Sequence, residues 1–306
     1  MIKHKTVLVL GAGASLPYNF PTTEDLRLKI LSLAKNFTLR DSTELDVEIN
    51  QVVEFFNSFY YSGTYSIDEF LGKREEFTKI GKLLIAKSLL AYENAQNLFS
   101  FQSSRDWYKI LVQSLTEDVS LDHLAINNSL TIITFNYDRS LEQYLFLALK
   151  NQFGAEENEV AQHLSKLNII HLHGQLGYLP WQSIEGADKK VEYMNGLDPE
   201  RIKEAANGIK IIYETDFKLH EFERAISAIE YAETVLFLGF GYHPLNLKRL
   251  SLSGNKGGRY VGGTALGLGN IQIQKAVNDS NNTLQRHNLY QDYDILKLFN
   301  ERYSLT

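Results

Sequence analysis

The chain has 306 residues, of which 44% are hydrophobic and 12% aromatic, so it is long enough to bury a substantial core. Its 31 basic and 37 acidic residues give a net charge of -6, which disfavours long-range attraction to nucleic acid or anionic lipid. The sequence contains no cysteine, which excludes disulfides, thiolate metal ligands and a cysteine nucleophile. We therefore expect a folded globular protein that does not bind nucleic acid directly.

The N-terminal residues combine a basic start with an apolar run at positions 6–10 and then small residues. Secretory signals share this order, but the run is short, and a buried parallel strand that enters a glycine turn explains the same residues. No stretch approaches the roughly 20 apolar residues that cross a bilayer. The sequence predicts a cytoplasmic protein without a membrane segment.

Apolar, β-branched runs recur along the chain and predict an α/β fold with a Rossmann-like parallel sheet. Besides residues 6–10, they occupy positions 130–135, 167–172 and 234–238, and each ends in polar or glycine residues. Ligands of open α/β sheets bind beyond the carboxyl ends of the strands. The candidate functional motifs all follow such strand ends, which favours a single site at that edge.

More than a hundred residues separate the first two predicted strands, and they have helical character. This is far more than one crossover needs, so we expect a large inserted helical module. Residues 21–26 and the Ser66 to Glu69 segment have the hydroxyl caps and acidic first turns of helix starts. Residues 175–210 are expected to form a loop or small lid. The expected organisation is one domain over the whole chain; its core comes from residues 1–24 and 126–270, the insertion is 25–125, and 271–306 are unassigned.

A glycine turn follows the first predicted strand. Gly11 and Gly13 allow a tight turn in which backbone amides approach a pyrophosphate, and Ser15 adds a hydroxyl. The candidate phosphate-binding residues are thus Gly11, Ala12, Gly13 and Ser15. The third glycine of the usual dinucleotide fingerprint is replaced by Leu16, so a turn that serves packing alone is an equal alternative.

The second predicted strand leads into Asn136 and Asp138. In an extended chain their side chains point to the same side. An amide and a carboxylate at that place can orient a water and a ribose hydroxyl. Taken alone, the segment is more typical of an ordinary turn with local side-chain hydrogen bonds.

The strand at 234–238 is followed by Gly239 and Gly241. Glycines leave room for a ribose or a base, so both are candidates for contact with the adenosine side of a dinucleotide. A loop shaped only by glycine and proline is a comparable interpretation.

Two histidines, His171 and His173, end the strand at 167–172, and their spacing predicts one shared face. A metal site would need a third ligand, and its candidates are only guesses such as Asp138 or His243, so no metal is expected. A histidine that titrates near neutral pH is better suited as a general base, the role we assign to His173. His171 is expected to be a partly buried structural residue.

Read in order, the motifs Gly-Ala-Gly-Ala-Ser, Thr-Phe-Asn-Tyr-Asp, His-Leu-His-Gly and Gly-Phe-Gly-Tyr-His-Pro resemble those of the sirtuin superfamily, especially the NAD-consuming enzymes of prokaryotic anti-phage defence. Residues 66–71, Ser-Ile-Asp-Glu-Phe-Leu, resemble a recurring segment of that branch. The resemblance implies a sirtuin-like NAD-binding fold in which Asn136 and His173 are catalytic and Asp138 belongs to the NAD site. The zinc module of deacetylating sirtuins needs four cysteines, so no zinc is expected. Their Asp-Phe-Arg motif is replaced here by Pro-Thr-Thr-Glu at 21–24.

The resemblance implies an NAD glycohydrolase that splits its substrate NAD into nicotinamide and ADP-ribose and acts by NAD depletion in abortive infection. Such an enzyme must be restrained in an uninfected cell, which favours a homo-oligomer, a complex with a helicase-like ATPase, or both. The alternatives are a non-catalytic subunit that senses NAD or ADP-ribose and a sirtuin-type deacylase or ADP-ribosyltransferase.

Overall fold

A computed structural model describes residues 1–100, 105–183, 189–194, 196–211, 220–252 and 258–306. In this part of the chain a six-stranded, all-parallel sheet has the order β3-β2-β1-β4-β5-β6, the doubly wound order of Rossmann-like folds. The strands are β1 (Thr6–Leu10), β2 (Leu130–Thr134), β3 (Asn168–His171), β4 (Thr234–Leu238), β5 (Tyr260–Thr264) and β6 (Leu289–Tyr290). The α/β class and the parallel sheet expected from the sequence are confirmed.

The central strand β1 is buried on both faces, which explains its continuous apolar run. Its alternate residues enter two separate cores: Leu8 and Leu10 face one side, and Val7 and Val9 face the other. Strand β1 pairs with β2 on one side and with β4 on the other, so the strand order reverses between β1 and β4. Such a reversal opens a crevice at the carboxyl ends of the two strands, where ligands bind.

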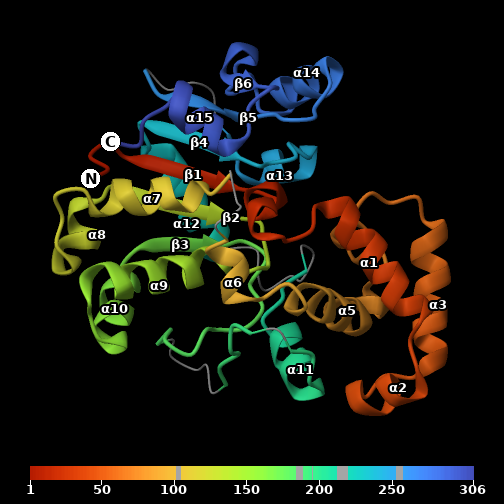
Figure 1. Ribbon diagram of the computed structural model, residues 1–306. Coiled ribbons are helices and arrows are strands. Elements are labelled where there is room, and N and C mark those ends of the chain that lie inside the picture. The colour runs from red at the N-terminus through yellow and green to blue at the C-terminus, as the bar shows by residue number, and fades with distance from the viewer. Residues whose placement is uncertain (101–104, 184–188, 195, 212–219, 253–257) are drawn as a thin grey trace.

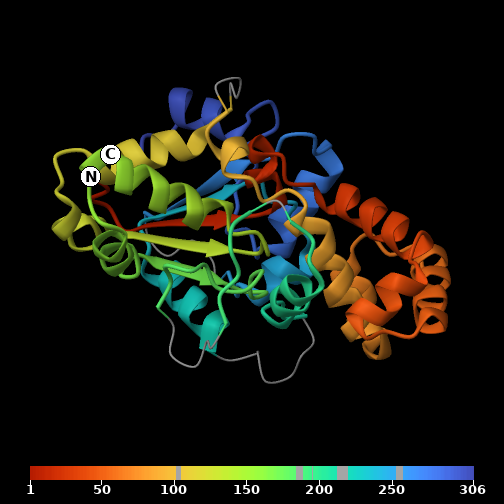
Figure 2. The ribbon, with the colours of Figure 1, turned by 60° about the horizontal axis from the view of Figure 1, so that its bottom comes forward.

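Helices cover both faces of the sheet (Figures 1 and 2). Buried residues of α7, α9, α10 and α15 join the core of one face, and those of α12, α13 and α14 join the core of the other. These helices are α7 (Trp107–Thr116), α9 (Ser140–Phe153), α10 (Glu157–Leu164), α12 (His220–Tyr231), α13 (Pro244–Arg249), α14 (Asn270–Asp279) and α15 (Ile295–Glu301). Short 3₁₀ turns are η1 (Ala12–Ala14), η2 (Leu16–Tyr18), η3 (Glu75–Phe77), η4 (Leu121–His123) and η6 (Arg286–Asn288).

The segment between β1 and β2 is helical, and its first helices project beyond the carboxyl ends of the strands (Figure 1). Thr22 caps α1 in a reciprocal capping box with Asp25, and Ser66 caps α4 by accepting from the Glu69 amide. Both helix starts therefore lie where the sequence predicts them. Besides α7, the helices are α1 (Thr23–Lys35), α2 (Leu39–Leu45), α3 (Ile49–Tyr61), α4 (Ile67–Leu71), α5 (Thr78–Leu90), α6 (Ala95–Leu98) and α8 (Leu124–Asn127).

The C-terminal part contains more structure than the sequence indicates. The sequence predicts a loop or small lid at 175–210, and the described part of this range includes the helix α11 (Pro199–Asn207), which begins with an Asp198 cap. Residues 184–188 and 195 of this range lie outside the described residues. A glycine-rich stretch at 254–269 contains β5, a strand not predicted from the sequence, and residues 254–257 of this stretch lie outside the described residues. Strand β6 extends the sheet beyond residue 270.

No helix in the described ranges combines the length and the apolar character that a bilayer crossing requires.

Candidate active site

A cavity of about 430 Å³ lies at the carboxyl edge of the sheet, within the size range of small-molecule sites. It is lined by residues from loops that follow different strands. Gly11 and Ala12 follow β1, Asn136 follows β2, His173 follows β3 and Gly241 follows β4. The loops that carry the sequence motifs therefore converge on one cavity.

The turn after β1 packs directly against the turn after β4. Gly11 and Gly13 donate their amides to the carbonyls of Leu238 and Gly239, at 3.1 and 2.9 Å. A Cβ atom on Gly11 would lie 2.7 Å from the Gly239 oxygen, and one on Gly13 would lie 2.9 Å from the Gly239 Cα. Close packing of two backbones therefore requires glycine here, as the packing interpretation of the motif expects.

Few amides of this turn are open to a phosphate. The amides of Gly11 and Gly13 are bonded to the β4 loop, and those of Ala14 and Ser15 donate to carbonyls within the turn. The Ala12 amide has no acceptor among the described residues, and Ala12 lines the cavity. The turn therefore offers a ligand one open backbone donor.

Asn136 is 9% exposed, and its amide is fixed by the glycine turn. Nδ2 donates to the Gly11 carbonyl at 3.0 Å and to the Ser15 hydroxyl at 3.1 Å. The Asn136 backbone amide donates to the Thr134 hydroxyl at the end of β2, which fixes the start of the loop. Since both protons of Nδ2 are used internally, the side-chain oxygen is the atom left to accept a hydrogen bond from a ligand or water.

Asp138 lies beneath the loop and does not line the cavity that Asn136 shares with His173. Its carboxylate accepts from the Ser140 amide at 3.1 Å and from the Ser140 hydroxyl at the start of α9. Burial raises the pKa of Asp138, while hydrogen bonds from Ser140 and Ser15 oppose the rise. Asp138 instead lines a neighbouring cavity of about 80 Å³, which Asn136 and Asp68 also line.

His173 is buried, with 4% of its surface exposed, and lines the cavity. Its Nε2 has no hydrogen-bond partner among the described residues. The ring of Phe135 packs edge-on at 5.4 Å. Burial lowers the pKa of His173 and Arg249 lowers it further, while the Asp68 carboxylate raises it. Since the net shift is downward, the imidazole is neutral at neutral pH and can accept a proton.

His171 does not share the site of His173, although the sequence predicts that both lie on one face. Strand β3 ends at His171, so the alternation stops before His173. His171 lines a different cavity, where Nε2 contacts the Glu142 carboxylate and Nδ1 lies 3.3 Å from the Asn136 carbonyl. Burial opposes the protonation of His171, but the Glu142 carboxylate, helped by the Asn136 backbone carbonyl and by Asp138, raises its pKa overall. Across the described residues, no three histidine, aspartate or glutamate side chains are grouped to hold a metal.

A second cavity of about 290 Å³ adjoins the first at Ala12 and Gly241. It extends toward β5 and α15 and is lined by Gly13, Gly239 and Thr264, among others. The Gly239 amide donates to the Thr264 hydroxyl at 2.9 Å. The predicted contact residues Gly13 and Gly239 thus belong to the second cavity, and Gly241 to both.

The sequence interpretation gave no role in the site to Asp68 or Tyr137, although it singled out the segment that contains Asp68. Asp68 lies in the first turn of α4 and lines the cavity with Asn136 and His173. The Tyr137 hydroxyl donates to Asp68 Oδ1. The Ser66 cap that marks the start of α4 is the sequence signal that places this carboxylate at a helix end.

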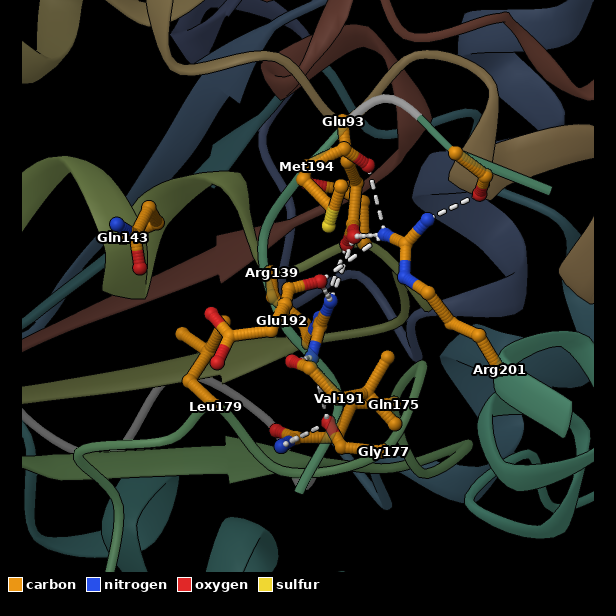
Figure 3. Close-up of polar contacts among 12 residues, drawn as sticks. Glu93, Arg139, Gln143, Gln175, Gly177, Leu179, Val191, Glu192, Met194 and Arg201 are labelled. Carbon is orange, nitrogen blue, oxygen red and sulfur yellow. Dashed lines mark hydrogen bonds and ion pairs between the residues drawn. The ribbon is translucent and has the colours of Figure 1, made fainter. Parts of the chain in front are cut away.

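A buried ionic cluster holds Arg139, the residue after Asp138 (Figure 3). The Arg139 guanidinium binds both oxygens of Glu93, and both side chains have no exposed surface. Arg201 of α11 binds the same carboxylate at 2.9 Å. Arg139 and Arg201 also donate to backbone carbonyls of residues 191–194. The cluster therefore ties the inserted helices and α11 to the segment that carries Asn136.

No protein-family model matches this chain, and no curated protein matches it in sequence.

Proposed function

We propose that this chain is a sirtuin-like NAD glycohydrolase that releases nicotinamide from NAD. The observation that carries the proposal is the convergence of Asn136 and His173 on one cavity beside the Gly11 turn. The Rossmann-like strand order supports it, because dinucleotides bind at the strand-order reversal of such sheets. The two adjoining cavities offer room on either side of that turn.

Departure of nicotinamide leaves positive charge on the anomeric carbon of the ribose, and a water must then attack that carbon. Asn136 has its side-chain oxygen available to hold this water or a ribose hydroxyl, because Nδ2 is occupied by Gly11 and Ser15. His173 accepts the proton of the water at Nε2, directly or through a ribose hydroxyl. The neutral state that burial favours at His173 is the state that a base requires.

The test is product analysis by chromatography after NAD is mixed with the purified protein. We expect nicotinamide and ADP-ribose from the wild type, and a loss of at least about a hundredfold in turnover for Asn136→Ala and His173→Ala. Asn151→Ala and His287→Ala are matched controls, since both side chains are exposed and lie outside the cavity. Undiminished turnover in folded Asn136→Ala or His173→Ala protein would refute the assignment.

The proposal includes restraint by assembly, because unrestrained NAD hydrolysis kills the cell that makes the enzyme. We propose that the chain acts in anti-phage defence as a homo-oligomer or with a helicase-like ATPase. Size measurement by light scattering, combined with the nicotinamide assay across protein concentrations, tests this part. A monomer that is fully active without partners contradicts restraint by assembly.

A further inference from the structure

The short helix α4 brings a carboxylate from the inserted module into the cavity. Asp68 lies in its first turn, directly after the Ser66 cap, and is half-buried. The next residues anchor the helix, because Phe70 is 2% exposed and its ring lies 4.8 Å from that of Phe59 on α3. The position of Asp68 is therefore set by the packing of the inserted helices and not by the sheet.

Tyr137 connects Asp68 to the loop that carries Asn136 and to the ring of His173. Tyr137 is the residue after Asn136; its hydroxyl donates to Asp68 Oδ1, and its ring centre lies 6.0 Å from that of His173. The second carboxylate oxygen, Oδ2, has no hydrogen-bond partner in the described part of the chain. One oxygen of Asp68 is therefore fixed, and the other is available in a cavity that Asn136 and His173 also line.

We propose that Asp68 is a further active-site residue whose free carboxylate oxygen stabilises the ribose as nicotinamide leaves. This inference rests on the proposed NAD glycohydrolase function. The bond between the anomeric carbon and the nicotinamide nitrogen breaks, and its electron pair stays with the nitrogen. A water oxygen then bonds to the anomeric carbon, and the proton of the water passes to His173. The Asp68 carboxylate stabilises the positive charge that develops on the ribose.

Other charged and titratable groups surround the same cavity from several elements. Asp68 and Glu69 come from α4, His243 from the loop before α13, and Lys275 from α14, while Arg249 on α13 acts on His173. Glu69 is paired with Lys73 at 2.8 Å. Of these groups, Asp68 is the carboxylate that is hydrogen-bonded to the Asn136 loop, because it accepts from the Tyr137 hydroxyl.

Asp68 also acts on His173, which gives the inference a second measurable signature. The Asp68 charge raises the pKa of His173 against the larger effect of burial. Removing the charge in Asp68→Asn lowers that pKa further, so the acid limb of the pH profile moves to lower pH. A carboxylate whose charge does not reach His173 would leave the acid limb where it is.

The experiment compares nicotinamide release and NAD binding in the full-length wild type, Asp68→Asn and Tyr137→Phe. Tyr137→Phe removes the phenol that binds Asp68 but keeps the carboxylate. Glu76→Gln is the control, because Glu76 lies in the same module, is exposed and pairs only with Arg74 among the described residues. We expect kcat to fall about a hundredfold in Asp68→Asn with NAD affinity nearly unchanged, and to fall much less in Tyr137→Phe.

If the wild type releases nicotinamide and kcat is undiminished in Asp68→Asn, this inference is overturned and the proposed function stands. Equal losses in Asp68→Asn and Tyr137→Phe, without a shift of the acid limb, also overturn it, since Asp68 then serves only to hold Tyr137. If Asp68→Asn does not fold, Asp68→Ser is measured in its place under the same criteria. A wild type that releases no nicotinamide in any assembly state removes the proposed function and this inference together.

Discussion

Replacing Gly239 with alanine tests the packing of the two glycine turns beneath the cavity. Gly239 has a φ of +58°, and an added Cβ would lie 2.2 Å from the Ala14 nitrogen and 2.3 Å from the Gly13 carbonyl carbon. The left-handed backbone costs about 1–2 kcal/mol with a side chain. Overlap with rigid backbone adds about 1–3 kcal/mol. We expect Gly239→Ala to lower the free energy of unfolding by about 2–5 kcal/mol, a large share of the total for a typical domain.

Gly241→Ala is the matched control, because a Cβ on Gly241 meets no atom of the described residues within 4 Å apart from its chain neighbours. For a chain of this size we expect Gly239→Ala to lower Tm by about 3–8 °C in a thermal melt, and Gly241→Ala to leave Tm nearly unchanged. Gly241 lines both cavities, so its new methyl group would project toward a bound dinucleotide. We expect Gly241→Ala to weaken NAD binding about tenfold, or 1.4 kcal/mol, in a calorimetric titration.

The two variants separate the two interpretations of the glycine motifs. If Gly239→Ala melts with the wild type, the turns are not packed as tightly as the backbone contacts require, and the reasoning from close packing is wrong. If Gly241→Ala binds NAD as tightly as the wild type, the dinucleotide does not pass this glycine.

The remaining predictions concern buried titratable groups. Because burial lowers the pKa of His173, nicotinamide release should persist to below about pH 6.5 before it falls; a loss that begins above this pH contradicts a neutral buried base. Between the lowered pKa of folded His173 and about pH 6.5, this histidine binds more protons in the unfolded chain than in the folded one. The contribution of His173 to the stability of the fold therefore falls as pH drops through this range. His171 has the opposite pH dependence, because its pKa is raised: protonated His171 stabilises the fold fully below about pH 6.5, and this stabilisation is lost as pH rises through the raised pKa of the folded state. Glu142→Gln should therefore reduce stability to urea more at pH 6 than at pH 9. An equal loss at both pH values refutes the pairing of His171 with Glu142. Glu142→Gln should also slow nicotinamide release, because Glu142 holds His171, whose Nδ1 lies 3.3 Å from the Asn136 backbone carbonyl. Glu93→Gln removes the charge that two buried guanidinium groups share and should cost about 3–5 kcal/mol in urea unfolding; an unchanged midpoint would show that the cluster does not hold the fold.

The sequence was sufficient for the elements whose signal is local. The residues of β1 form one apolar run, because both faces of a central parallel strand are buried, and the Thr22 and Ser66 caps mark helix starts within a few residues. Strand β5 was missed because Gly262 and Gly263 weaken the strand pattern. A Cβ on Gly263 would lie 2.0 Å from the Phe237 oxygen of β4, so neighbouring backbone requires the glycine.

The sequence also predicted that Asn136 and His173 lie close together, and both line one cavity because they follow strands that end at the same edge of the sheet. The roles of their neighbours depended on tertiary contacts. Asp138 is two residues from Asn136 but turns toward Ser140 beneath the cavity, and His171 turns toward Glu142 in another one. Asp68 lies at the cavity because the inserted helices pack there, and the hydroxyl of Tyr137, 69 residues away, donates to its carboxylate. Periodicity and capping act over a few residues, whereas these side-chain directions follow from contacts between segments far apart in the chain.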